Sequence, residues 1–163
     1  MNIRKATTDD LPTIMRIIDH GRDIMRKNGN TKQWTNGYPS EKQILIDIDN
    51  GNGYLICENG TPVATFAMII GDEPTYKEIF NGQWIDNSRQ YTTIHRLATT
   101  SKCHGIAELC FDFAWEKTRN IRIDTHRDNL IMRHIAEKYG FLYCGIIYLD
   151  NGDERLAFQK TEN

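Results

Sequence analysis

Residues 91–125 constrain the fold of this chain more than any other stretch, because they follow the order strand, loop, helix and strand. Residues 91–99 and 121–125 have the apolar or alternating pattern of strands. Between the two strands, apolar side chains recur at the spacing of one helix face, at Ile106, Leu109, Cys110 and Phe113. A strand, a helix and a second strand in this order predict a mixed α/β protein.

The remaining segments surround this unit with further helices and strands. Asn59-Gly60 lies between two apolar runs and predicts a β-hairpin, and Ser40 is expected to cap a helix. Residues 71–90 are polar and mixed, which predicts a loop with about one helical turn. Besides the central unit at residues 91–125, strands are expected at residues 2–7, 53–58, 61–70, 141–149 and 154–160. Helices are expected at residues 8–29, 41–49 and 129–140.

The totals of the sequence exclude several classes of protein. The chain has 163 residues, of which 39% are hydrophobic and 26% charged, and its net charge is -2. This composition is that of a single folded domain, residues 1–163. The charge balance supports neither a nucleic-acid partner nor binding to a membrane surface. The N-terminus lacks the apolar run of a signal peptide, and no stretch reaches the roughly 20 apolar residues of a spanning helix, so a cytoplasmic location is expected.

The loop at residues 99–109 (TTSKCHGIAEL) admits three interpretations. Cys103 and His104 could be a nucleophilic pair, but neighbours in an extended loop point apart. They could belong to a metal site, but no spacing of cysteine and histidine matches a zinc pattern. The third interpretation assigns the chemistry to the backbone. Gly105 opens a helix whose unpaired N–H groups attract a phosphate, and Lys102 adds a positive charge. An anion site is therefore expected here, and no metal.

The sequence K-C-H-G-I-A resembles the R/Q-x-x-G-x-G/A motif of the GCN5-related N-acetyltransferases, the GNAT superfamily. A second family motif is similar to RIDTHRDN and HIAEKYGF, with Asn129 at the family's asparagine and Gly140-Phe141 at its Gly-Phe. The N-terminal IRKATTDDLPTI is similar to the usual opening, so the resemblance covers nearly the whole chain. It implies a mixed, mostly antiparallel sheet of about six or seven strands, with helices on both faces.

The resemblance also implies acetyl-CoA as co-substrate and direct attack of an amine on its thioester, without a covalent enzyme intermediate. The pyrophosphate would bind the amides of the loop, and the pantetheine would run beside the strand that ends in Leu-Ala-Thr, like an added strand. The residues implied to contact this co-substrate are Leu97, Ala98, Thr99, Lys102, Cys103, His104, Gly105, Ile106, Ala107 and Asn129.

Proton transfer would need further side chains. Many relatives use a tyrosine on the last helix as general acid, but Ala136 occupies that position here. Tyr139, one turn later on the same helix, is a candidate substitute, and water or a residue of the next strand, such as Tyr143 or Cys144, is an alternative.

His126 and His95 are the candidates for the general base. His126 is preferred because it follows a strand end, where ligands of α/β proteins usually bind. The alternative for each histidine is a structural hydrogen bond.

The acceptor is expected to be a small-molecule or peptide amine, and its identity stays open. Trp34 and Tyr38 lie in the irregular segment between the first two helices, a region that often walls the acceptor site in this family. Alternatively, both aromatics cover the core. A rival function is a non-catalytic acyl-CoA-binding or sensing protein of the same fold, which Ala136 favours. The sequence leaves open whether the chain is a monomer or a homodimer.

Overall fold

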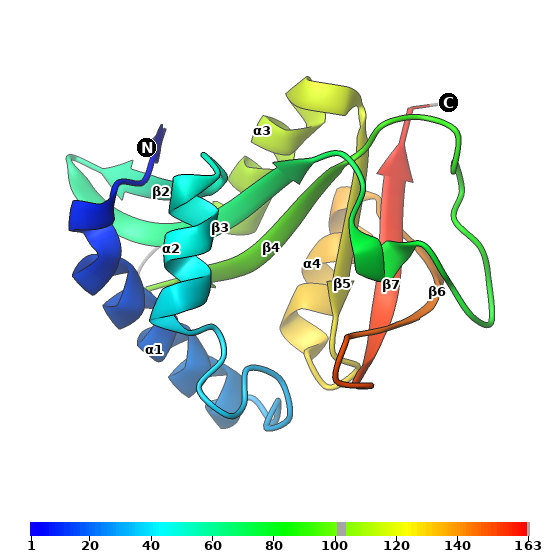
Figure 1. The fold of residues 1–163 in the computed structure, drawn as a ribbon, viewed down its shortest axis with the longest axis horizontal. Coiled ribbons are helices and arrows are strands. Elements are labelled where there is room, and N and C mark those ends of the chain that lie inside the picture. Colours follow the sequence, from blue (N-terminus) through cyan, green and yellow to red (C-terminus); the bar gives the residue numbers. More distant parts are fainter. Residues whose placement is uncertain (101–103, 163) are drawn as a thin grey trace. The chain divides into compact units, whose positions relative to one another are not determined.

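The computed structural model describes residues 1–100 and 104–162 and confirms a mixed α/β fold (Figure 1). Its strands are β1 (Asn2–Lys5), β2 (Gly53–Glu58), β3 (Thr61–Ile70), β4 (Thr92–Thr99), β5 (Asn120–Thr125), β6 (Leu142–Tyr148) and β7 (Glu154–Thr161). Its helices are α1 (Leu11–Lys27), α2 (Glu41–Asp49), α3 (Ile106–Thr118) and α4 (Leu130–Tyr139), with 3-10 turns η1 (Thr8–Asp10) and η2 (Pro74–Tyr76).

Within the described residues, seven strands form one sheet in the order β1-β2-β3-β4-β5-β7-β6. Pairing is antiparallel between β1 and β2, β2 and β3, β5 and β7, and β6 and β7. Strands β4 and β5 are parallel, and their register covers only two residue pairs, Thr92 with Ile121 and Thr93 with Arg122. A mostly antiparallel sheet flanked by helices is the architecture that the sequence resemblance implied.

Local signals explain where several elements begin and end. Ser40 Oγ accepts a hydrogen bond from the Gln43 N–H at 3.1 Å and caps α2 as expected. The Asn129 side chain accepts from the Met132 N–H at 3.2 Å and caps α4. Gly140 ends α4 with a φ of 104°, a left-handed conformation that glycine adopts at little cost.

The chain divides into two compact units, each with segments from both halves of the sequence. Unit 1 comprises Met1–Met68 and His95–Ala107, and unit 2 comprises Ile69–Ile94 and Glu108–Asn163. Strand β4 therefore begins in one unit and ends in the other. The expectation of a single domain over residues 1–163 stays a prediction.

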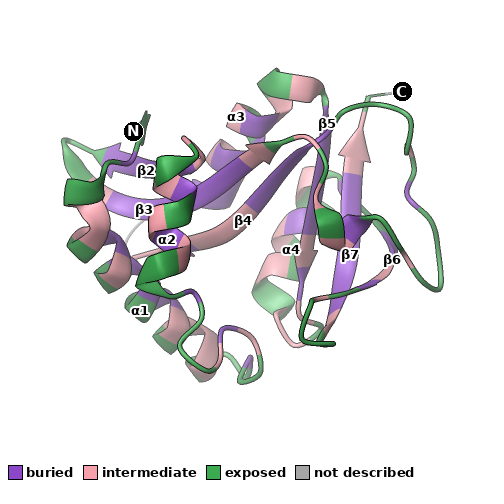
Figure 2. Ribbon diagram, in the orientation of Figure 1, coloured by how far each residue is buried: buried purple, intermediate pink, exposed green. Residues whose placement is uncertain are grey.

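The core of unit 1 lies between its helices and its strands. Ile14, Ile17 and Ile18 of α1 are buried in one cluster with side chains of α2, β2 and β4. Figure 2 shows this buried side of α1 facing the strands, while its outer side is exposed. Gly21 brings α1 close to β4, because a Cβ at that position would lie 3.1 Å from the Cβ of Ala98.

A buried ion pair joins α2 to β4 in unit 1. Arg96 donates to both carboxylate oxygens of Asp47, at 2.7 and 2.6 Å, and to the Tyr38 hydroxyl at 3.0 Å. The side chains of Arg96 and Asp47 are only 9% and 6% exposed. Arg96 also has a φ of 53°, a conformation that costs a non-glycine residue roughly 1–3 kcal/mol. The bidentate contact fixes the strand in this strained form.

Residues 71–91 of unit 2 form a folded segment, which we call the strap. The expected helical turn is present as η2, and three aromatic side chains of the segment are buried. Tyr76, Trp84 and Tyr91 are 1%, 7% and 6% exposed and form a cluster with residues of β6 and β7. The sequence pattern missed this because the aromatics are separated by polar residues and follow no strand or helix period.

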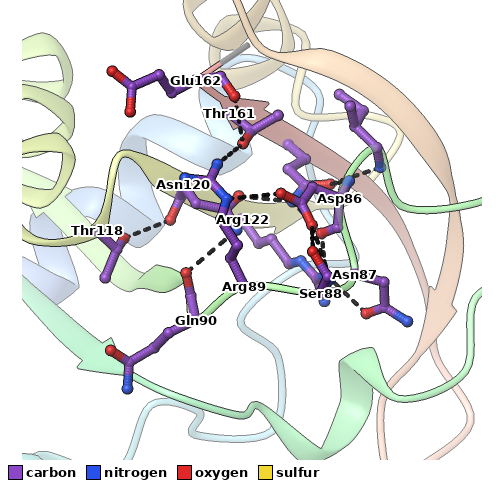
Figure 3. A network of polar contacts seen from close by, with 12 residues as sticks. Asp86, Asn87, Ser88, Arg89, Gln90, Thr118, Asn120, Arg122, Thr161 and Glu162 are labelled. Carbon is purple, nitrogen blue, oxygen red and sulfur yellow. Dashed lines mark hydrogen bonds and ion pairs between the residues drawn. The ribbon is translucent and has the colours of Figure 1, made fainter.

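Polar contacts hold the strap against β5 and β7 (Figure 3). The guanidinium of Arg122 lies 4.1 Å from the Trp84 ring and 4.0 Å from the Tyr91 ring, and it donates to the Asp86 carbonyl at 2.9 Å. Gln159 of β7 accepts from the Ile85 N–H at 2.7 Å and donates to the same Asp86 carbonyl at 2.9 Å. The strap is therefore anchored by its backbone as well as its aromatic rings.

Replacing Asp47 with asparagine is predicted to lower the free energy of unfolding by about 3–5 kcal/mol, because the buried Arg96 loses its counter-ion. Tyr38→Phe is the matched control, since it removes a neutral and more exposed partner of the same guanidinium and should cost about 1 kcal/mol. Urea unfolding of both variants measures the difference. Equal losses would contradict a dominant role for the Asp47 contact.

Candidate functional site

The expected anion site lies where α3 begins. His104 and Gly105 are exposed, whereas Ile106 and Ala107 are buried in the first turn of α3. Gly105 has a φ of 76°, and apart from its own atoms and its chain neighbours no described atom lies within 4 Å of the position that its Cβ would occupy. The first N–H groups of a helix have no partner inside it, so they can bind an anion that approaches this open glycine. Lys102 and Cys103, which were predicted to contribute, lie outside the described residues.

The strand residues predicted to contact the pantetheine precede this loop. Ala98 is 4% exposed and belongs to the unit 1 core, while Leu97 and Thr99 are partly exposed. Thr99 Oγ1 donates to the Val63 carbonyl at 3.3 Å. All three residues lie beyond the two residue pairs that register β4 with β5. A ligand could therefore contact the main chain of β4 in the segment that is not paired with β5.

Asn129 of unit 2 connects α4 to β5. Its side chain caps α4, and its Nδ2 donates to the Thr125 Oγ1 at 3.0 Å. Both contacts fix the carboxamide at the junction of strand and helix. The position therefore has a structural role in addition to the predicted contact with the pantetheine, which stays a prediction.

The two candidate histidines belong to different units. His95 is partly buried in the unit 1 part of β4. His126 follows β5, and its Nδ1 accepts a hydrogen bond from the Asp128 N–H at 3.0 Å. This bond holds the turn before α4 and occupies one ring nitrogen of His126. The role of either histidine as general base remains a prediction.

The candidate general acid Tyr139 lies on the outer part of α4. Its hydroxyl donates to the Asp112 carboxylate of α3 at 2.6 Å. Burial, followed by this hydrogen bond and the charge of Asp112, raises the pKa of Tyr139 above its ordinary value. Ala136, at the family's usual tyrosine position, is fully buried. The role of Tyr139 as general acid stays a prediction, and its occupied hydroxyl disfavours it.

The two aromatics predicted to wall the acceptor site have different surroundings. Trp34 is 7% exposed and belongs to the unit 1 core, with its carbonyl accepting from Arg26 at 2.9 Å. Tyr38 is 42% exposed, and its hydroxyl accepts from Arg96. The core interpretation of the sequence analysis thus fits Trp34, while Tyr38 remains accessible to a substrate.

Sequence reasoning missed a pair of side chains in unit 2. Asp124 of β5 is partly exposed, and its Oδ2 accepts a hydrogen bond from the Tyr76 hydroxyl at 2.6 Å. Burial, together with the charge of Asp124, raises the pKa of Tyr76 well above its ordinary value. The alternation of polar and apolar residues in NIRIDT could have indicated that Asp124 lies on the face of β5 opposite Ile123. Nothing in the sequence pattern indicates Tyr76 as its partner.

In the part of the chain that the structure describes, no group of three or more His, Cys, Asp or Glu side chains is placed to hold a metal ion. None of the helices described is both long and apolar enough to cross a membrane.

Comparison with known proteins gave matches among solved structures only, since no family model and no curated protein matches the chain. A GNAT-family acetyltransferase from Streptococcus agalactiae 2603 is 35% identical, with a TM-score of 0.89 over 99% of this chain and 95% of that one. A GNAT-family acetyltransferase from Listeria monocytogenes 4b F2365 is 18% identical, with a TM-score of 0.70 over 98% and 93% of the two chains. A chain of the NatC complex bound to Gag peptide and CoA is 15% identical, with a TM-score of 0.66 over 99% and 98%.

The last two similarities show the fold alone. The first combines substantial identity with nearly complete coverage of both chains. It agrees with the motifs at Gly105, Asn129 and Gly140-Phe141. The chain therefore belongs to the GNAT family of acetyltransferases.

Proposed function

We propose that this chain transfers an acetyl group from acetyl-CoA to a primary amine, by direct attack in a ternary complex. The observation that carries the proposal is the start of α3, where Gly105 has a positive φ and open space at the position of its missing Cβ, so that an anion could approach the first N–H groups of the helix. Membership of the family supports acetyl transfer in general. The CoA named in the structure of the NatC complex supports this donor.

The residues near Gly105 would hold the diphosphate of acetyl-CoA. Their contribution is electrostatic, since a helix N-terminus carries a partial positive charge and unpaired N–H donors. Lys102 would add a charge, and the amides of Cys103, His104 and Ile106 would add donors. Leu97 and Thr99 would contact the pantetheine through main-chain groups, as an added strand does, and Asn129 would contact the same arm.

The reaction needs a neutral amine, because an ammonium ion has no lone pair to attack the thioester. A base must therefore remove a proton from the amine before attack. Holding both reactants in one complex supplies much of the remaining acceleration. The lone pair of the nitrogen forms the amide bond, the carbon–sulfur bond breaks, and the CoA thiolate leaves with that electron pair.

A second candidate function is binding or sensing of an acyl-CoA without turnover. One observation favours it: Ala136 is fully buried at the position where many relatives have their tyrosine acid. The CoA thiolate is a good leaving group and can take its proton from water, so the missing hydroxyl is compatible with catalysis. We therefore prefer the enzyme.

Gly105→Asp is predicted to weaken acetyl-CoA binding by more than about tenfold, because a negative charge would face the diphosphate at the helix start. Gly105→Asn is the matched control, since asparagine has nearly the same shape and also tolerates the left-handed conformation. Equilibrium dialysis with acetyl-CoA measures both affinities. Equal affinities in two folded variants would contradict an anion site at Gly105.

Incubation of the purified protein with acetyl-CoA and a primary amine is predicted to release free CoA thiol faster than an amine-free sample. The acetylated amine should form in equal amount, which mass spectrometry can measure. Acetyl-CoA binding without thiol release for a broad panel of amines would contradict the enzyme and support the sensing protein.

A further inference from the structure

We propose that Asp124 binds the amine acceptor and takes its proton, and that Tyr76 of the strap is the positioning residue for this carboxylate. The inference deepens the proposed function and rests on it. It assigns the acceptor to the class of cationic primary amines.

A row of polar side chains on one face of β5 leads to Asp124. Asn120, Arg122 and Asp124 alternate with Ile121 and Ile123, which are buried on the other face. Asn120 and Arg122 are 0% and 1% exposed, whereas Asp124 is partly exposed. Of these three polar side chains, the first two are therefore buried, and Asp124 is the one in contact with solvent.

Asp124 also lies beyond the region where β5 is paired with β4. The parallel register ends at Thr93 and Arg122. On its other side, β5 remains paired with β7, where Asp124 lies opposite Ala157. The strand that carries the carboxylate is thus fixed from one side, and ligands of α/β proteins usually bind toward the carboxyl ends of parallel strands.

Tyr76 fixes the orientation of the carboxylate. Its hydroxyl donates to Asp124 Oδ2 at 2.6 Å, and the tyrosine side chain is 1% exposed. The raised pKa of Tyr76 keeps the hydroxyl protonated, so it is a permanent donor. The strap holds Tyr76 in turn, since the Tyr76 carbonyl accepts from Trp84 Nε1 at 2.9 Å and the Trp84 ring lies against Arg122. Oδ2 of Asp124 is therefore engaged by Tyr76, and this hydrogen bond fixes the orientation of the carboxylate.

No basic side chain among the described residues forms an ion pair with Asp124. The ion pairs elsewhere in the chain show the contrast, because Asp47 binds Arg96 and Asp10 binds Arg4. A partly buried carboxylate without a protein cation is stabilised when a cationic ligand supplies the charge. A primary amine is such a ligand at neutral pH, and Oδ1 of Asp124 is the oxygen that the Tyr76 hydroxyl leaves available.

In the proposed reaction, the amine loses one proton before the acetyl group is transferred. The ammonium ion of the acceptor gives a proton to the Asp124 carboxylate, which passes it to water. The neutral nitrogen then attacks the carbonyl carbon of the thioester, and the carbon–sulfur bond breaks with its electron pair on sulfur. The remaining extra proton on nitrogen leaves with the CoA thiolate as the free thiol. The products are an acetylated amine and CoA.

The test compares two carboxylate–tyrosine pairs of the same chain with equal hydrogen-bond lengths. Asp124→Asn keeps an acceptor for the Tyr76 hydroxyl and removes only the charge. Asp112→Asn makes the same change in the Tyr139 pair, whose hydrogen bond is also 2.6 Å. Tyr76→Phe removes the positioning hydroxyl. Each protein is titrated with acetyl-CoA alone and then assayed for acetylation of agmatine, spermidine, lysine amide and a peptide with an N-terminal alanine.

We expect Asp124→Asn to lower kcat/KM for the accepted amine by about 10²–10⁴-fold, with acetyl-CoA affinity within about twofold of the wild type. Tyr76→Phe should lower kcat/KM by about tenfold through the loss of one hydrogen bond to a charged group. Asp112→Asn should match the wild type, because Asp112 binds the Tyr139 hydroxyl, and that hydrogen bond disfavours Tyr139 as the general acid. If Tyr76→Phe does not fold, the comparison of Asp124→Asn with Asp112→Asn decides alone.

Full activity of Asp124→Asn on an amine that the wild type acetylates would overturn the inference and leave the proposed function intact. A wild type that binds acetyl-CoA but acetylates none of the four amines would also overturn the assignment of the acceptor class. A wild type that does not bind acetyl-CoA would overturn the proposed function itself, and the inference with it.

Discussion

The buried guanidinium of Arg122 determines how one whole face of unit 2 is built. It lies between the rings of Trp84 and Tyr91 and donates to the Asp86 carbonyl. Burial lowers the pKa of Arg122, but an arginine remains protonated in a folded protein. A buried charge of this kind must be stabilised by its surroundings. Two aromatic faces can each contribute roughly 2 kcal/mol in a desolvated site, so the strap must stay in place for Arg122 to stay buried.

This constraint links the polar residues of β5 to the proposed chemistry. Arg122 and Gln159 both donate to the Asp86 carbonyl of the strap, and Tyr76 of the same segment donates its hydroxyl to the Asp124 carboxylate. The strap thus orients a partly exposed carboxylate at the end of a strand. The start of α3 differs, because it has a glycine with open space at the position of its missing Cβ, where a helix N-terminus can bind an anion. We thus propose that the backbone binds the acetyl donor and that a side chain held by the strap binds the acceptor.

Much of the architecture could be predicted because its signals are local. Ser40 caps α2, Asn129 caps α4, and the hairpin turns at Asn59 and Gly60, both with positive φ. Each of these positions depends on a few neighbouring residues. Gly105 was predictable for the same reason, since a glycine before an amphipathic helix is visible in the sequence.

The hydrogen bond between Tyr76 and Asp124 and the packing of the strap could not be predicted, because they depend on residues far apart in the chain. Tyr76 and Asp124 are separated by 48 positions, and Arg96 and Asp47 by 49. The polar composition of residues 71–90 indicates a loop, but only tertiary packing decides that its aromatics are buried. For the same reason Trp34 could not be assigned to the core from the sequence.

The central claim is that the chain binds acetyl-CoA, and a calorimetric titration of the purified wild-type protein with acetyl-CoA tests it most directly. The account predicts saturable binding with a dissociation constant on the order of micromolar, which corresponds to about 8 kcal/mol. The absence of saturable binding at millimolar acetyl-CoA, in a protein that is folded by circular dichroism, would contradict it.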